Sequence, residues 1–359
     1  MQRTQKVISF PHMGSYHVPI EIFLGLIFPD HRIMTAPRIT KRTLELGSRY
    51  SPDFVCVPFK YNLGNYIEAL ELGANVLIQA GGGCRYGYYA EIQELILRDL
   101  GYEFEFIKLL SDRVSPLNLY RICRRIGTRL SFRQFVYYLL VVVRMVKIID
   151  ETEAYIRENI GFETVPRSFE DLHEEFFKAL RKVRTFKSLR AVAREYGRRF
   201  RALKTDKPAD CLKVGVVGEL YTLMEPFSNF FIEKELAKNR IQVSRYITVS
   251  FLLFEKRRMQ KRVLKAAGKY LKYHIGADGT DSVERAKTLA ERGYDGIIHL
   301  KPFGCMPEVN AMPMLQNISR DYGIPVLYFS FDSQTSETGV RTRLEAFYDM
   351  LVMRKEKCV

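Results

Sequence analysis

The feature that most constrains the fold is an alternation of strand-like and helix-like segments at both ends of the chain. In the N-terminal third, short apolar runs such as "KVISF" and "ANVLIQA" are separated by helical patterns over 61–73 and 88–101. This alternation is typical of βαβ units that build a parallel sheet. The sequence predicts four strands there, at 6–10, 53–57, 74–80 and 102–109.

The C-terminal part of the chain returns to the same alternation. Between the two parts, residues 111–207 carry apolar residues at helical spacing and no convincing strand, which predicts a helical subdomain. The prediction is an α/β protein with two Rossmann-like parallel-sheet domains, at 1–110 and 208–359, and the helical subdomain at 111–207 between them. The C-terminal strands are expected at 212–218, 241–249, 294–300 and 324–331.

Positive charge is concentrated in the middle of the chain. The net charge is +15, and residues 111–211 carry 22 basic against 13 acidic residues. Four arginines in the segment 181–204 fall at helical spacing and predict one basic stripe: Arg190, Arg194, Arg198 and Arg201. This stripe is either a solvated face or a dock for an acidic partner or the phosphates of coenzyme A. No recognisable nucleic-acid-binding module accompanies it, so nucleic acid is not the expected partner.

Cysteine usage and the N-terminus indicate a reducing compartment. Six cysteines in 359 residues, none at CxxC spacing, are far from a disulfide scaffold. The N-terminal residues lack an apolar secretory core, so a cytoplasmic location is expected. The longest apolar run, 135–143, is too short to span a bilayer, so no membrane association is expected.

Three of the cysteines are predicted at corners where a strand leads into a helix. Cys56 ends the predicted strand "DFVC", and Cys84 follows "NVLIQAGGG". Cys305 follows "GIIHLKPFG" and precedes the helical "EVNAMPML". Ligands of parallel sheets bind at these carboxyl edges, and a helix N-terminus lowers the pKa of a thiol. Four glycines would let the backbone approach a bound group: Gly81, Gly82, Gly83 and Gly304.

Each corner also has a simpler interpretation. A single cysteine is more often a small buried hydrophobe, and the triple glycine lacks the spacing of a phosphate-binding loop. Three thiols from two domains would suit a soft metal centre. Zinc usually takes four ligands with local CxxC pairing, whereas three dispersed cysteines fit an iron–sulfur cluster with one open iron. From spacing alone, both interpretations stay open.

Three further polar residues are expected near the same sheet edges. Glu308 opens the helix after Cys305, where helix preference alone accounts for it and proton transfer is the minority interpretation. Glu219 follows the strand "VGVVG" and is a candidate to support the site. His12 follows the first strand and is either a satisfied polar residue or an acid or base.

Several segments resemble the family called CoA protein activases, which are relatives of the 2-hydroxyacyl-CoA dehydratase subunits and of double-cubane cluster proteins. The resembling segments include "VGVVGELYTLMEPFSNFFIEKEL", "GYDGIIHLKPFGCMPEVNAM", "DFVCVPFKYNLGNYIEALELGAN" and "AGGGCRYGYYAE". The motif "PFGCMPE" within the second segment is quite specific. The resemblance runs over nearly the whole chain and is strongest from about 212 to 350.

The resemblance implies a [4Fe-4S] cluster between two α/β domains, held by Cys56, Cys84 and Cys305. It implies single-electron transfer from an ATP-hydrolysing actin-like activator protein to a small molecule, plausibly an acyl-CoA, in a homo- or heterodimer. The chain has no actin-like nucleotide domain, and Ser333 stands after Asp332 where relatives have an acidic pair. Two alternatives remain: a non-enzymatic scaffold or regulatory partner of an activator, and a nucleotide-binding α/β protein that uses the Gly81–Gly83 turn.

Overall fold

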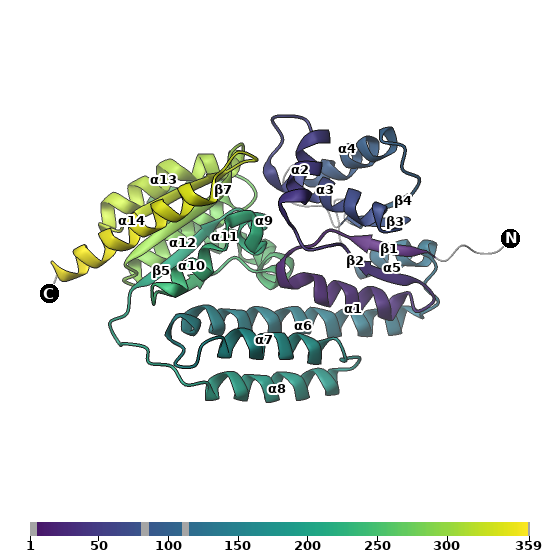
Figure 1. Ribbon diagram of the computed structural model, residues 1–359, viewed down its shortest axis with the longest axis horizontal. Helices are drawn as coiled ribbons and strands as arrows, with labels where there is room; N and C mark the ends of the chain where they lie inside the picture. Colours follow the sequence, from purple (N-terminus) through teal and green to yellow (C-terminus); the bar gives the residue numbers. More distant parts are fainter. Residues whose placement is uncertain (1–5, 80–85, 110–114, 358–359) are drawn as a thin grey trace. The chain divides into compact units, whose positions relative to one another are not determined.

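The computed structural model describes residues 6–79, 86–109 and 115–357. They group into two compact units, each built around a four-stranded sheet (Figure 1). Unit 1 contains residues 1–146 and 176–194, and unit 2 contains residues 147–175 and 195–359. The predicted α/β class with two Rossmann-like parallel sheets is therefore confirmed.

The sheet of unit 1 is entirely parallel, with strand order β2-β1-β3-β4. Its strands are β1 (Val7–Phe10), β2 (Arg32–Thr35), β3 (Val76–Gln79) and β4 (Glu105–Lys108). The helices packed with it are α1 (His17–Ile27), α2 (Lys41–Tyr50), α3 (Val57–Glu71), α4 (Tyr86–Asp99) and α5 (Pro116–Ile126), and a short 3-10 turn, Gly14–Tyr16, precedes α1.

The predicted strand at 53–57 is wrong, and a strand at Arg32–Thr35 takes its place in the sheet. Phe54 is 99% exposed, so the apolar run "DFVCV" has no layer in which to bury its side chains. Pro58 instead fixes the first turn of α3, for which its locked φ is suited. Cys56 is consequently the residue that caps α3, and it does not end a strand.

Helices cover both faces of the unit 1 sheet. One apolar cluster joins α3 and α4 to the sheet through Tyr66 of α3, Leu97 of α4 and Leu77 of β3. A second cluster on the other face includes Ile8 and Ile78 from the strands and Leu24 from α1. Burial on both faces explains why the inner strands are almost uniformly apolar.

Helix α3 is fixed against α2 by two glycines. A Cβ at Gly47 would lie 1.7 Å from the carbonyl oxygen of Lys60, and one at Gly64 would lie 1.9 Å from that of Thr43. Only glycine permits backbones to pack this closely. The close α2–α3 crossing sets the position of α3, and with it the position of Cys56.

The sheet of unit 2 has the same topology, with order β6-β5-β7-β8 and every pair parallel. The four predicted C-terminal strands are confirmed as β5 (Lys213–Gly218), β6 (Gln242–Arg245), β7 (Gly296–Pro302) and β8 (Val326–Phe331). Its helices are α9 (Leu220–Met224), α10 (Ile232–Lys238), α11 (Lys256–Ala267), α12 (Gly279–Glu291), α13 (Met306–Tyr322) and α14 (Glu337–Glu356). Short turns of 3-10 helix at Pro226–Asn229 and Gly268–Tyr270, and of π-helix at Phe251–Glu255, complete it.

The two faces of this sheet are covered by different helices. Ile297 of β7 packs in one cluster with Leu289 of α12 and Leu315 of α13. On the other face, Gly296 leaves room for Phe347 and Leu351 of α14, since a Cβ there would lie 2.7 Å from the Phe347 ring. β7 is thus buried on both faces along its whole length.

The middle of the chain is helical, as predicted. It forms α5, α6 (Phe132–Asn159), a 3-10 turn at Ile160–Phe162, α7 (Ser168–Leu180) and α8 (Phe186–Ala202). The two units each take part of this segment, with divisions inside α6, α7 and α8. A separate subdomain at 111–207 stays a prediction. Across the described residues, no helix combines the length and the apolar character that crossing a membrane requires.

Candidate functional site

The carboxyl ends of β5 and β7 lie next to each other in the centre of the unit 2 sheet. Gly218, the last residue of β5, pairs with Leu300 of β7. The strand order reverses direction between these two strands, because β6 lies outside β5 and β8 outside β7. Ligands of open parallel sheets bind at such a switch point. Glu219 and Cys305, which follow these strands, are therefore at the expected place for a site.

Cys305 occupies the corner between β7 and α13, as the sequence predicted. It has extended backbone angles and is the residue that caps α13, with a partly exposed side chain. Its amide donates to the carbonyl of Pro302 at 3.1 Å, and its carbonyl accepts from the amide of Val309 at 2.9 Å. Gly304 lies in the exposed turn just before it. A thiol at a helix N-terminus is favoured as thiolate.

Lys301 is a site residue that sequence reasoning missed. It is 3% exposed and is the last residue but one of β7, with its Nζ donating to the carbonyl of Phe303 at 3.3 Å. Burial holds the pKa of Lys301 below its ordinary value, although the neighbouring Cys305 and Glu308 oppose this shift. A buried lysine in an apolar strand is unusual, and that was the available sequence signal.

Glu308 is completely buried and bonded to two partners. Its Oε2 lies 2.7 Å from Nε2 of His299, and its Oε1 accepts from the hydroxyl of Ser282 at 3.2 Å. These partners come from β7 and α12, so the carboxylate ties two helices to the strand. The Nδ1 atom of His299 and the hydroxyl of neighbouring Tyr328 have no hydrogen-bond partner within the described part of the chain. The expected position of Glu308 in the first turn of α13 is confirmed, and its role stays a prediction.

Glu219 caps the short helix α9. Gly218 before it has φ +144°, and a Cβ there would lie 1.8 Å from the carbonyl oxygen of Leu300. The Glu219 carboxylate accepts from the amides of Tyr221 and Thr222 at 3.0 and 2.9 Å. Burial, together with the nearby charge of Asp278, raises its pKa to about 7 despite these hydrogen bonds. Glu219 can therefore hold or release a proton near neutral pH.

A small charged cavity adjoins this edge of the sheet. It has a volume of about 270 Å³ and is lined by Lys256, His274, Thr280 and Asp281, among others. Lys256 contacts Asp278 at 2.5 Å and Asp281 at 2.9 Å, and although burial opposes it, these carboxylates raise the pKa of Lys256. Pro307 in the first turn of α13 lies close to this wall, since a Cβ at Gly276 would be 3.6 Å from its ring.

Cys56 in unit 1 is also partly exposed and also precedes a helix. Its Sγ lies 3.0 Å from the hydroxyl of Tyr89 on α4. The Tyr89 ring packs edge-on against Phe59 in the first turn of α3, at 4.8 Å between centroids. Tyr89 therefore holds the thiol in place, a role that the sequence did not indicate.

His12 follows β1 and is almost buried. Its amide donates to Oδ1 of Asn65 on α3 at 2.7 Å, and its ring stacks on that of His17 at 4.6 Å. The guanidinium of Arg181 can only donate, so Nε2 of His17 accepts from it and Nδ1 donates to the carbonyl of Gly14. Burial lowers the pKa of His17, which favours this neutral form.

Part of the predicted constellation lies outside the described residues, namely Cys84, Gly81, Gly82 and Gly83. Within the described residues, no three His, Cys, Asp or Glu side chains are grouped as metal ligands. Cys123 and Cys211 are buried, and burial raises the pKa of Cys123 to about 12, which disfavours the thiolate form that a metal ligand needs. The structure thus brings Cys305, Lys301 and Glu308 together in unit 2, and Cys56 with Tyr89 in unit 1.

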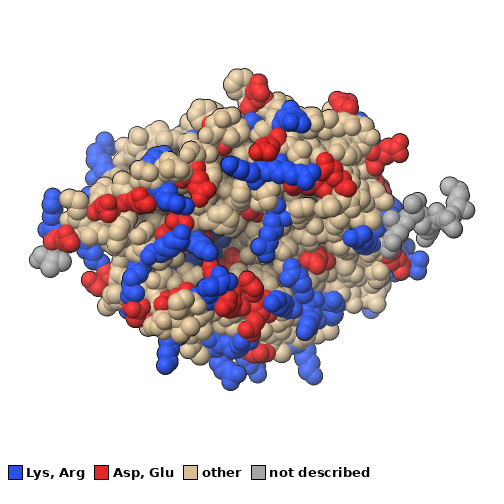
Figure 2. All heavy atoms as spheres, viewed as in Figure 1, with Lys and Arg blue, Asp and Glu red and all other residues tan. Residues whose placement is uncertain are grey.

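The predicted basic stripe is confirmed as an exposed face of α8. Arg190, Arg194, Arg198 and Arg201 are all exposed, while Leu189 and Phe200 of the same helix are buried. Figure 2 shows blue side chains along the edge where Figure 1 draws α8. Its exposure is compatible with both interpretations, a solvated face and a docking surface.

Comparison with known proteins places the chain next to a described family. The family model described as 2-hydroxyglutaryl-CoA dehydratase, D-component, matches residues 142–351, which is more than half of the chain. The matched segment includes Glu219, Lys301, Cys305 and Glu308, whereas His12 and Cys56 precede it. No curated protein sequence matches the chain.

Proposed function

The chain belongs to the family of the 2-hydroxyglutaryl-CoA dehydratase D-component, and from this premise we propose that it is the iron–sulfur component of a 2-hydroxyacyl-CoA dehydratase-like system. In this proposal Cys56, Cys84 and Cys305 hold a [4Fe-4S] cluster. The substrate is a small acyl-CoA, and single electrons come from an ATP-hydrolysing actin-like activator. The observation that carries the proposal is Cys305 at the β7–α13 corner beside Lys301, inside the matched segment.

The thiols present fit such a group chemically. Ligating cysteines must be deprotonated and reachable, and Cys56 and Cys305 are partly exposed, each at the start of a helix. The buried Cys123 and Cys211 lack these properties. Cys56 and Cys84 belong to unit 1 and Cys305 to unit 2, so the proposal requires both units to contribute to one cluster.

A bound cluster would supply single-electron transfer and an open iron position for a substrate oxygen. The chain's own residues would supply charge and protons around it. Lys301 places a buried ammonium beside Cys305, where it would attract an anionic or carbonyl oxygen of the substrate. Glu219, with a pKa of about 7, would hold the proton that leaves or joins the substrate.

The cavity of about 270 Å³ next to α13 would take part of the substrate. Lys256 in its wall stays protonated, because Asp278 and Asp281 raise its pKa. Glu308 would act indirectly, because its carboxylate holds β7, α12 and α13 together through His299 and Ser282. In this role Glu308 positions Lys301 and Cys305 and does not touch the substrate.

Anaerobic purification followed by iron and acid-labile sulfide analysis tests the proposal. We expect about four iron and four sulfide per chain after reconstitution, as the proposed cluster type requires. Cys305→Ser and Cys56→Ser should each lose most of this iron. Cys211→Ala, which removes a buried thiol that is no proposed ligand, should keep it. A folded chain that stays free of iron after reconstitution would contradict the proposal.

A further inference from the structure

Unit 2 contains a second and larger cavity of about 630 Å³ that the proposed function does not use. It lies between the end of α6, the start of α7, the segment α9–α10 and β6. None of its lining residues is a candidate site residue named above. A volume of this size is typical of pockets that bind small organic molecules.

The lining of this cavity combines an apolar body with an excess of positive charge. Ile156, Ile160, Leu223 and Phe231 supply apolar surface. Its charged residues are five cations, Arg157, Arg167, Lys234, Lys238 and Arg245, against three carboxylates, Glu163, Glu170 and Glu233. A pocket of this composition favours a ligand with an anionic head and an apolar tail.

Arg157 in the lining of this cavity has buried hydrogen-bond donors that lack an acceptor in the part of the chain that the structure describes. Its side chain is 7% exposed, and its Nε and Nη2 have no hydrogen-bond partner within the described residues. These two N–H groups form the side-on edge of the guanidinium, which matches the two oxygens of a carboxylate or phosphate. A buried charged donor without an acceptor raises the free energy of the folded state, because its desolvation is not compensated. An anion bound at this edge would supply the missing acceptors.

The nearest carboxylate is already shared among several cations. Nη1 of Arg157 lies 3.6 Å from Oε2 of Glu153, which is also 3.9 Å from Nη2 of Arg245. The other oxygen of Glu153 lies 3.7 Å from Nε2 of His173. Burial opposes the charge of Glu153, but His173 and the two arginines lower its pKa to about 2. This carboxylate stays ionised and still cannot serve the Nε–Nη2 edge of Arg157.

Phe231 at the cavity is held in an unfavourable backbone conformation. Phe230 and Phe231 have φ of 55° and 57°, the left-handed region that bulky side chains avoid. The amide of Phe231 donates to the carbonyl of Pro226 at 2.9 Å, and Oδ1 of Asn229 accepts from the amide of Ile232. Phe231 is 47% exposed and forms part of the cavity wall.

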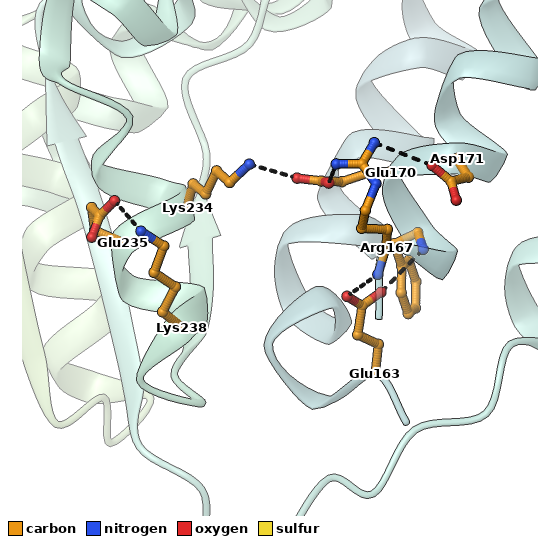
Figure 3. A network of polar contacts seen from close by, with 8 residues as sticks. Glu163, Arg167, Glu170, Asp171, Lys234, Glu235 and Lys238 are labelled. Atoms are coloured by element: carbon orange, nitrogen blue, oxygen red, sulfur yellow. Dashed lines mark hydrogen bonds and ion pairs between the residues drawn. The ribbon is translucent and has the colours of Figure 1, made fainter. Parts of the chain in front are cut away.

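Ion pairs join the two walls of the cavity. Figure 3 shows Lys234 reaching from α10 toward Glu170 of α7, and Arg167 approaching the same carboxylate. The distance is 2.8 Å both from Nζ of Lys234 to Oε1 of Glu170 and from Nη1 of Arg167 to Oε2 of Glu170. Glu163 accepts from the amides of Arg167 and Phe169 and so fixes the start of α7. The walls are therefore pre-organised before any ligand enters.

We propose that this cavity binds a small organic anion. Its carboxylate or phosphate would accept from Nε and Nη2 of Arg157, and its apolar body would lie against Phe231 and Ile160. The proposal is independent of the cluster, because no lining residue is a proposed cluster ligand.

Isothermal titration calorimetry on the metal-free full chain tests the proposal with three probes: hexanoate, butyl phosphate and hexylamine. We expect at least one anion to bind, with the tighter one identifying the headgroup, and we expect the amine not to bind. Arg157→Met should weaken binding by about 10-fold or more, since charge-assisted bidentate hydrogen bonds are lost.

A second variant keeps the test decisive if the buried Arg157→Met fails to fold. Lys238→Glu reverses an exposed charge in the cavity wall and should weaken anion binding by about 3-fold or more at low salt. Lys272→Glu makes the same charge change at an exposed lysine outside the cavity and should leave binding unchanged. Binding of hexylamine equal to hexanoate, no anion binding, or equal effects of the two lysine variants would overturn the proposal.

Discussion

The two sheets have the same strand order, yet the polar cross-links between their central strand and the following helix differ in chemistry. In unit 1, Gln79 of β3 donates to Gln93 of α4 at 2.9 Å. In unit 2, the equivalent pair is His299 of β7 and Glu308 of α13, at 2.7 Å. All four side chains are buried. One topology is therefore stabilised by neutral amides in one unit and by ionisable groups in the other.

This difference indicates a division of tasks between the two units. The sheet edge of unit 2 carries buried ionisable side chains, including Lys301, Glu219 and Asp278. Among the described residues, the corresponding edge of unit 1 carries the thiol of Cys56 with a tyrosine hydroxyl, and His12. We infer that proton handling belongs to unit 2, whereas the described edge of unit 1 holds the Cys56 thiol among mostly neutral groups.

The largest expected effect is that of Glu308→Ala. The change leaves His299 and Ser282 buried without their acceptor, so we expect a loss of roughly 3–5 kcal/mol in the free energy of unfolding. Urea denaturation followed by circular dichroism measures it. Glu337→Ala, an exposed carboxylate at the start of α14, should change stability by less than about 0.5 kcal/mol. Equal effects of the two variants would contradict a structural role for Glu308.

The next largest effect is a pH dependence of the free energy of unfolding, which we expect Glu219 to cause. Its folded pKa of about 7 exceeds the ordinary value of 4.5, so the folded state binds the extra proton between these values. Stability from this group is complete below about pH 4.5 and is lost as pH rises to about 7, by about 3 kcal/mol in total. Glu219→Gln should show a shallower fall over this window than the wild type. Parallel stability profiles of the two proteins would contradict the raised pKa.

The neutral pair of unit 1 should matter less and should not depend on pH. Gln93→Ala removes the acceptor of Gln79 and the donor to the carbonyl of Phe59, so we expect a loss of roughly 1–3 kcal/mol. Denaturation at pH 5 and at pH 8 should give the same difference from the wild type. A difference that changes with pH would remove the contrast between the two units.

The smallest expected effect is that of removing the contact between the Tyr89 hydroxyl and the Cys56 thiol. Tyr89→Phe removes the hydroxyl that lies 3.0 Å from Sγ and should cost about 1 kcal/mol or less, because the ring still packs on Phe59. The rate of Cys56 alkylation by iodoacetamide, read by peptide mass spectrometry, should change, while that of Cys305 should not. Unchanged alkylation of Cys56 would mean that the tyrosine does not govern its reactivity.

Local sequence signals predicted the corner of Cys305 correctly. The run "DGIIHL" is a continuous apolar strand, and Pro307 in the first turn of α13 marks the start of a helix. These signals act over a few neighbouring residues, so they need no knowledge of the rest of the fold. The same local signals were misleading for "DFVCV", which has a strand-like composition but no strand beside it among the described residues. They also did not reveal β2, because its side chains are only partly buried and the segment is not strongly apolar.

The pairing of distant polar groups could not be predicted in this way. Ser282 and Glu308 are 26 residues apart in sequence, and His299 looked like one polar residue in an apolar strand. Lys301 lies one residue beyond the predicted strand at 294–300, whereas the structure includes it in β7 as a buried residue close to Cys305 and Glu308. The cavity around Arg157 draws its walls from α6, α7, α10 and β6, and no single segment carries its pattern.

By itself, the sequence determined the alternation of strands and helices, the parallel α/β class and the position of Cys305 where a strand ends and a helix begins. These follow from hydrophobic period and turn chemistry, which are local properties of the chain. Only the tertiary structure decided which polar groups are buried together. The raised pKa of Glu219 depends on burial and on Asp278, and the setting of Cys305 depends on Lys301, because desolvation and charge act through space between residues that the fold brings together.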